Sequence, residues 1–293
     1  ATTSMLLIAV GLVVNVVAMT GIGNTFSLMV TEWAGGSLLI TLVLVALASL
    51  ILGMGLPVTA AYIVLATLSA PALYGLMAES RLLDMIMLGG LPEAAQMIFM
   101  LVDPEKLPLL SAPMSEVDAR ALLSAVPADF KGQLLEQALD PEALAMLLLS
   151  AHMIIFWLSQ DSNVTPPVCL TAFAAAAIAK TPPMATGFMA WKIAKGLYIV
   201  PLLFAYTNFI GGTGLEVFSI FVFAMFGLYA FVGFMEGYLE GPLNLGLRVL
   251  SGMLAIVLLW PHGEWLLNIA AVVCFLLIFM FSRRQANMQA AAA

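Results

Sequence analysis

The chain has 293 residues, of which 63% are hydrophobic and only 9% are charged, and its mean hydropathy is +1.08. Soluble domains carry about 25% charged residues, so this composition excludes an ordinary soluble protein and predicts an integral membrane protein. The net charge of −7 does not suggest a nucleic-acid partner, because eleven acidic and four basic residues lie together within residues 79–142. We therefore predict that this acidic segment is an insert outside the hydrocarbon.

The first predicted element is an apolar membrane helix over residues 5–19, which is short for a span. The sequence TGIGN at positions 20–24 favours non-helical backbone and is expected to end it. Residues 26–33 are predicted to form a short amphipathic helix along the interface, with Trp33 at headgroup depth. We assign residues 1–36 to this scaffold helix and interfacial arm helix.

A re-entrant hairpin is predicted over residues 37–74. Its arms, residues 37–52 and 60–73, flank a break with the sequence GMGLPVT at positions 53–59. Helices of these lengths are about 24 Å and 21 Å long. Neither comfortably crosses a hydrocarbon core of about 30 Å, so we expect both arms to enter and leave by one face.

The acidic insert is predicted over residues 75–142. A Ser or Asp cap followed by Pro and by acidic residues marks a helix start. Such signals occur as LPE at 91–93, DPEK at 103–106, SEVD at 115–118 and DPE at 140–142. We expect three or four short helices outside the membrane.

A broken transmembrane helix is predicted over residues 143–181. Its apolar arms, residues 144–158 and 168–179, flank a second break with the sequence SQDSNVTPP at positions 159–167. The remaining chain, residues 182–293, is predicted to supply transmembrane helices over 193–209, 217–235, 247–260 and 265–281.

The orientation follows from the basic residues, which gather on the cytoplasmic side of membrane proteins. They lie in three places that alternating spans put on one side: Lys180, Lys192 and Lys195; Arg248; and Arg283 and Arg284. The acidic insert and the open end of the hairpin then lie on the external face.

Both breaks have the chemistry of a Na⁺ site. Backbone carbonyls, hydroxyls and amide oxygens suit this ion, as do the C-terminal ends of helices. Pro57 and Pro166 keep the helix from closing again. The helix that follows each break directs its positive N-terminus inward, which suits an anionic substrate group. The candidate residues for sodium or substrate binding are Gly53, Gly55, Pro57, Thr59, Ser162, Asn163, Thr165 and Pro166, with Gln160 and Asp161 as further candidates.

Other interpretations stay open at this point. A simple proline kink explains a lone proline well, but it explains six polar residues and two prolines in nine positions poorly. Asp161 has either a direct role or a place in water at a cavity mouth. The chain could also be a channel or scaffold subunit without a coupling site. An intramembrane enzyme using His152 and Asp161 lacks a nucleophile or metal-ligand motif nearby.

The breaks and their flanks resemble the large membrane subunit of TRAP transporters. The resemblance rests on ILGMGLPVTAAYIV at 51–64, APAL at 70–73, AH at 151–152 and SNVTPPV at 162–168. The form GMGLPVTAAY is similar to the fused permeases of the TAXI branch. The long insert and the sequence SQD at 159–161 depart from the commonest pattern.

The resemblance implies an all-α elevator fold of the ion-transporter-superfamily type, and a permease rather than an enzyme. It implies sodium-coupled uptake of an organic acid across the bacterial inner membrane, with Na⁺ as the coupling ion and no other cofactor. A periplasmic binding protein would deliver the substrate, and a small membrane subunit or fused equivalent would complete the complex. Such permeases have two inverted repeats, each with one hairpin and one broken helix. One of each is present, so we expect the C-terminal half, with the other repeat in a preceding region or another chain.

Overall fold

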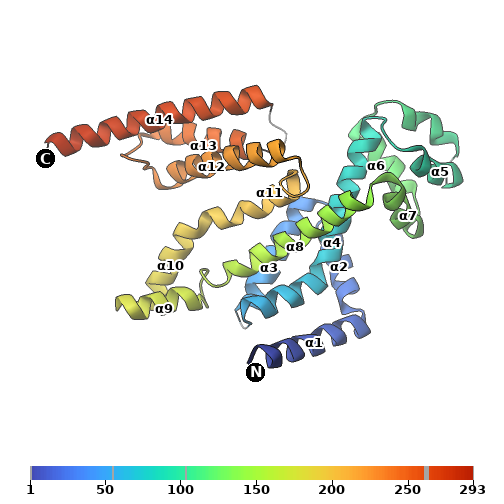
Figure 1. Cartoon of the computed structure of the whole chain (residues 1–293), viewed down its shortest axis with the longest axis horizontal. Coiled ribbons are helices and arrows are strands. Elements are labelled where there is room, and N and C mark those ends of the chain that lie inside the picture. The colour runs from blue at the N-terminus through green and yellow to red at the C-terminus, as the bar shows by residue number, and fades with distance from the viewer. Residues whose placement is uncertain (1, 55, 103, 261–263, 293) are drawn as a thin grey trace. The chain divides into compact units, whose positions relative to one another are not determined.

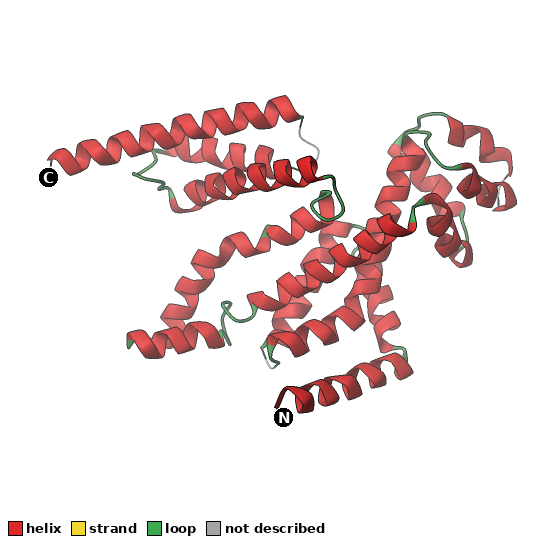
Figure 2. Cartoon of the chain, viewed as in Figure 1, coloured by secondary structure: helices red, strands yellow, loops and turns green. Residues whose placement is uncertain are grey.

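The computed structural model describes residues 2–54, 56–102, 104–260 and 264–292, and these are almost entirely helical (Figure 2). No strand occurs among these residues, only an isolated bridge between Tyr238 and Pro242. The all-α prediction is therefore confirmed for this part of the chain. The helices form two compact units, residues 1–194 and 195–293, each of which is described by itself (Figure 1).

Several helices are long and apolar enough to cross a membrane. There are five in the described chain, or six if the pair 11–20 and 22–33, bent by 70°, counts as one span. The five are Val58–Met87, Pro141–Asp161, Pro183–Tyr206, Gly214–Glu236 and Trp265–Met288. This confirms the prediction of a multi-pass membrane protein.

The first unit begins with α1 (Thr2–Thr20) and α2 (Ile22–Trp33). The break between them is narrower than predicted, because only Gly21, with φ of 68°, leaves the helical conformation. Gly23 lies inside α2 and against α4, where a Cβ would stand 2.8 Å from the carbonyl oxygen of Thr67. Glycine here permits close packing of two helices rather than ending one.

The predicted hairpin corresponds to α3 (Leu38–Gly53) and α4 (Val58–Met87). Ser37 caps α3 by accepting a hydrogen bond from the backbone of Ile40. The second arm is much longer than predicted: α4 has 30 residues, or about 45 Å of helix. It therefore continues past the predicted start of the insert at residue 75.

Pro71 lies inside α4 without ending it. A proline has no N–H, so the carbonyl of Thr67, four residues earlier, loses its helical donor. Gly23 of α2 packs against this carbonyl, and the Ser27 hydroxyl donates to the next one, that of Leu68, at 2.6 Å. Helix α2 thus packs closely against the backbone beside the proline and adds one hydrogen bond next to the carbonyl that lost its donor.

The insert contains α5 (Glu93–Val102), the 3₁₀ helix η1 (Pro104–Ser111), α6 (Glu116–Ala125) and α7 (Ala128–Ala138). The predicted starts agree with the bounds of α5, η1 and α6, and the fourth agrees with α8, whereas the start of α7 was not predicted. Ser115 caps α6 by accepting from the backbone of Asp118. The insert has an apolar core of its own, built on the last turns of α4. Its largest fully buried side chains are Leu82, Ile86, Phe99, Leu110 and Leu134.

The predicted broken helix is present as α8 (Pro141–Asp161) and α9 (Leu170–Ala179), with residues 162–169 between them. Lys180, with φ of 53°, ends α9, and α10 (Pro183–Ile193) packs back against it. The second break is therefore a non-helical linker and not a simple kink.

The second unit follows η2 (Ala194–Tyr198) and consists of α11 (Val200–Tyr206), α12 (Gly214–Glu236), α13 (Leu245–Leu259) and α14 (Trp265–Ala292). Close packing of α12 on α13 uses Gly227 and Gly233, where added Cβ atoms would meet Leu259 at 2.8 Å and Ser251 at 3.0 Å. Of the four spans predicted after residue 182, α13 has only 15 residues and falls below the length of a span.

Candidate functional site

The two breaks meet in space. Gly53, the last residue of α3, lies against Ser162, the first residue after α8, so that a Cβ on Gly53 would overlap the serine side chain. Sequence reasoning treated the breaks as two places, whereas they form one junction. Only glycine permits this approach at position 53.

Two helix C-termini converge at this junction, since α3 ends at Gly53 and α8 at Asp161. The last carbonyls of a helix lack intrahelical donors and carry a partial negative charge. Some are satisfied locally in the linker: the N–H of Asn163 donates to Gln160 at 3.1 Å, and the hydroxyl of Ser162 donates to Ser159 at 3.2 Å. Each carbonyl oxygen keeps a second lone pair for another partner.

Asp161 is a buried acidic residue of the junction whose carboxylate has no hydrogen-bond partner in the described chain. Its side chain is 1% exposed, and within the described chain neither carboxylate oxygen has a hydrogen-bond partner. An ionised carboxylate buried in this way costs several kcal/mol unless a charge or donors compensate it. The described chain therefore supplies no group that compensates the burial of this side chain.

One face of α3 carries two buried hydroxyls and ends at the junction. Thr41, Val45, Ser49 and Gly53 lie four residues apart on this face, and the first three are buried. Among the described residues, the hydroxyls of Thr41 and Ser49, and that of Ser69 on α4, have no hydrogen-bond partner. Buried polar atoms without partners are uncommon in folded proteins.

A contact between Tyr62 and His152 joins the hairpin to the broken helix. The Tyr62 hydroxyl of α4 lies 3.1 Å from Nδ1 of His152 on α8, and the tyrosine ring packs edge-on against Phe156 with centroids 5.6 Å apart. His152 therefore makes a hydrogen bond that packs two helices together. Sequence reasoning did not single out Tyr62, although its place inside the family-like run offered a signal.

The linker of the second break is packed from the other side by α10. A Cβ on Gly187 would stand 2.5 Å from the sulfur of Cys169 and 3.6 Å from the ring of Pro166. Cys169 is completely buried, and the peptide bond between Pro166 and Pro167 is cis. The close approach of α10 holds the linker in one non-helical path.

The predicted site residues are not all placed alike. Ser162, Asp161 and Thr165 are buried at the linker, whereas Gln160, Asn163 and Pro166 are half-buried. Pro57 and Thr59 are exposed at the start of α4. Gly55 lies outside the described residues. Gly53 and Ser162 are thus the predicted residues that the structure brings into direct contact.

These features define a multi-pass membrane protein with a helical hairpin and a broken helix whose breaks adjoin. The profile of the family described as "Tripartite ATP-independent periplasmic transporter, DctM component" matches residues 1–210. The chain therefore belongs to this family. No curated protein and no solved structure matches the chain.

Membership of this family indicates the general function of the chain. The chain is a membrane component of a TRAP secondary transporter, and DctM components work together with a periplasmic binding protein and a small subunit. The resemblance noted on the break motifs is confirmed at this level. The TAXI branch and the place of the chain as a C-terminal half stay predictions, and residues 211–293 lie outside the match.

Proposed function

We propose that this chain is the permease half of a sodium-coupled, binding-protein-dependent transporter of the TAXI type. It would import an organic acid across the bacterial inner membrane by an elevator movement. The observation that carries the proposal is the junction itself, where Gly53 meets Ser162 beside the buried carboxylate of Asp161.

A single Na⁺ at the junction would complete its unsatisfied groups. The carbonyl ends of α3 and α8 supply oxygen donors, and the Ser162 hydroxyl lies between them. Asp161 supplies a full negative charge that a cation would neutralise, which offsets the cost of burying it. Because the breaks adjoin, we infer one shared ion between them in this half of the transporter, rather than one ion for each break.

The substrate would bind beside this ion. Neither break contains an Arg or Lys, so the breaks have no charged anchor for a carboxylate. The N-termini of α4 and α9 carry the partial positive charge that suits an anionic group. A charged anchor, if the substrate has one, would come from the other repeat.

An elevator movement requires the hairpin and the broken helix to travel together. Helix α8 packs on both α3 and α4, and the Tyr62–His152 hydrogen bond joins α4 to α8. The hairpin and the first arm of the broken helix therefore form one packed body, whereas the second arm, α9, packs on α10. A packed body is suited to moving as a unit, because well-packed interfaces switch between positions rather than deform.

The experiment is uptake by the complete transporter in proteoliposomes, with Na⁺ and binding protein varied separately. We expect uptake to require both. Ser162→Ala and Thr165→Val should each raise the Na⁺ concentration needed about five- to thirtyfold, since losing one buried polar partner costs about 1–2 kcal/mol. Thr59→Val tests the exposed candidate, and Ser124→Ala, whose hydroxyl bonds Arg120 within the insert, is the matched control.

Unchanged Na⁺ dependence in Ser162→Ala and Thr165→Val, with normal expression, would contradict the coupling site. A channel or scaffold subunit, the alternative, would conduct or assemble without any Na⁺ requirement for uptake.

The membrane orientation has its own test. Cysteines placed at Ser111 or Ser124 in the insert should react with an impermeant thiol reagent from the periplasmic side. The exposed Cys274 is first replaced by serine, whereas the other native cysteine, Cys169, is buried. Labelling only from the cytoplasm would reverse the proposed topology.

A further inference from the structure

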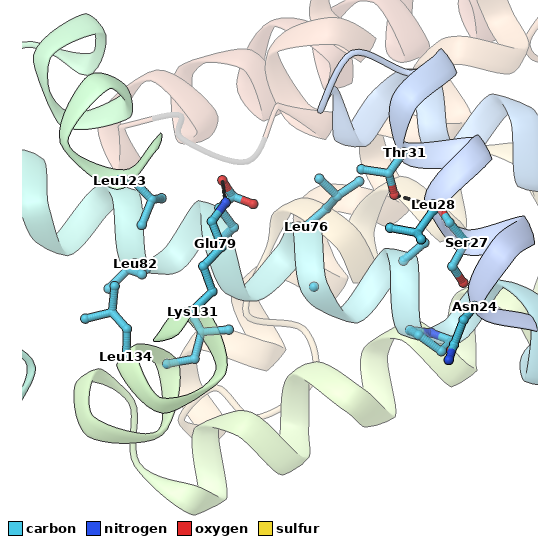
Figure 3. A pocket seen from close by; sticks show the side chains of 14 residues that line it. Asn24, Ser27, Leu28, Thr31, Leu76, Glu79, Leu82, Leu123, Lys131 and Leu134 are labelled. Atoms are coloured by element: carbon cyan, nitrogen blue, oxygen red, sulfur yellow. Dashed lines mark hydrogen bonds and ion pairs between the residues drawn. The ribbon is translucent and has the colours of Figure 1, made fainter. Parts of the chain in front are cut away.

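A groove of about 500 Å³ runs along α4, between α2 on one side and the insert helices α6 and α7 on the other (Figure 3). It is separate from the junction of the two breaks. Six leucines form most of its apolar lining: Leu28, Leu76, Leu82, Leu123, Leu134 and Leu135. Its volume is within the range of sites that bind small molecules.

A pair of opposite charges lies within the groove, with Leu76 on one side of it and Leu82 and Leu134 on the other (Figure 3). Lys131 of α7 lies 3.8 Å from Glu79 of α4, and the two side chains are 41% and 45% exposed (Figure 3). The pair is long for an ion pair and open to water, so its own strength is small. Both charges are available to a ligand that presents a positive and a negative group together.

At the α2 end of the groove, two hydroxyl groups are already engaged in hydrogen bonds to the protein backbone. The Ser27 hydroxyl donates to the backbone of Leu68 at 2.6 Å, and the Thr31 hydroxyl donates to the backbone of Ser27 at 2.9 Å. These donors are used within the protein. The groove therefore has a charged pair with apolar lining on both sides of it, and Asn24 adds an amide at the α2 end (Figure 3).

The groove also crosses the point where α4 becomes charged. No charged residue occurs from Val58 to residue 78, and then Glu79, Arg81 and Asp84 follow within two turns. In a helix that leaves a membrane, this change marks the level of the lipid headgroups. Gly75 and Leu76 precede this level on α4 and lie toward the hydrocarbon, as does Leu28 of α2, whereas Leu82 and the leucines of the insert lie on the water side beyond the Glu79–Lys131 pair (Figure 3).

We propose that the groove binds a zwitterionic phospholipid with an ammonium headgroup. Its phosphate would contact Lys131, its ammonium Glu79, and one acyl chain would lie along Leu28 and Leu76. The net charge of −7 within residues 79–142 disfavours an anionic phospholipid here.

The test uses the full chain purified in detergent and supplied with equal amounts of dioleoyl phosphatidylethanolamine and dioleoyl phosphatidylglycerol. Mass spectrometry then measures the lipid retained after washing. We expect at least one phosphatidylethanolamine per chain and at least a fivefold preference over phosphatidylglycerol. Gly75→Leu should reduce retention at least fivefold, because Gly75 lines the groove and open space faces its missing Cβ.

Matched controls separate the groove from general effects. Gly132→Leu places the same side chain at an equally open glycine of α7 that does not line the groove, and it should retain lipid. Glu79→Gln with Lys131→Gln should abolish the headgroup preference. Glu116→Gln with Arg120→Gln, which removes the 2.8 Å ion pair on α6, should not.

Two results would overturn the proposal. One is equal lipid retention in Gly75→Leu and in the unmodified chain. The other is a crosslinker at position 75 that joins the groove to a protein segment, rather than to lipid, in the complete transporter.

Discussion

The core of the insert and the junction of the two breaks are both buried, but they bury different chemistry. The insert core is apolar, with Phe99, Leu110 and Leu134 almost inaccessible. At the junction the buried side chains include Asp161 and Ser162. None of the partnerless buried polar atoms found in the described chain belongs to the insert, whereas the carboxylate oxygens of Asp161 do belong to the junction.

This difference distinguishes residues that stabilise the fold from residues that are expected to bind a ligand. An apolar core needs nothing beyond itself, because burial of its surface is the favourable term. A buried polar atom without a partner costs about 1–3 kcal/mol, and more if it is charged. The junction is therefore expected to be completed by a ligand, and substitutions in the two regions should have distinguishable consequences.

The largest expected effect lies in the insert core. Phe99→Ala should destabilise the insert by about 3–5 kcal/mol, because it removes a large buried side chain and leaves a cavity. Limited proteolysis of the insert measures this loss, with Na⁺ binding at the junction followed separately. Val117→Ala on the exposed side of α6 should change stability by less than about 0.5 kcal/mol. Equal protease sensitivity in the two variants would contradict an independent insert core.

The second largest expected effect is on Na⁺ binding at the junction. Asp161→Asn removes a buried charge that has no partner in the described chain, so it should not destabilise the protein in Na⁺-free solution. It should weaken Na⁺ binding about ten- to a hundredfold, since interactions with a charged group contribute about 1.5–3 kcal/mol. Thermal unfolding with and without Na⁺ measures both. A loss of stability without Na⁺ and no change in Na⁺ affinity would make Asp161 a structural residue.

Much of the fold was predictable because it depends on local signals. The apolar runs, the prolines and the Ser or Asp caps gave the hairpin, the insert helices and the broken helix. Proline was the least reliable guide. Pro57 and Pro166 occur at real breaks, but Pro71 lies inside α4, where α2 packs against the backbone beside it. Packing from another helix cannot be recognised in the local sequence.

The site was predictable as a set of residues but not as an arrangement. Polar residues beside prolines identified both breaks, and nothing in their spacing indicated that Gly53 would touch Ser162 across 109 positions. The same limit applies to Tyr62, whose role depends on facing His152. Ser49 was missed because a lone serine in an apolar run ordinarily indicates helix packing.

A smaller effect tests the close approach at the junction. Gly53→Ala forces a Cβ into the side chain of Ser162, and overpacking of this kind costs about 1–3 kcal/mol. Denaturant unfolding in micelles measures the cost. Gly75→Ala, in a helix with open space around the added methyl group, should instead be neutral or stabilising by up to about 1 kcal/mol. The double variant Gly53→Ala with Ser162→Gly should recover most of the loss, and failure to recover would contradict the contact.

The smallest effect concerns the hydrogen bond that joins the hairpin to the broken helix. Tyr62→Phe keeps the edge-on ring contact with Phe156 and removes only the hydroxyl that lies 3.1 Å from His152. The expected loss in the free energy of unfolding is about 1 kcal/mol, the usual net value of such a bond. A double-mutant cycle with His152→Leu isolates the pair, because the tyrosine hydroxyl should contribute nothing once its partner is absent. If Tyr62→Phe costs the same with and without His152, the two side chains are not coupled, and the packing of α4 on α8 depends on apolar contacts alone.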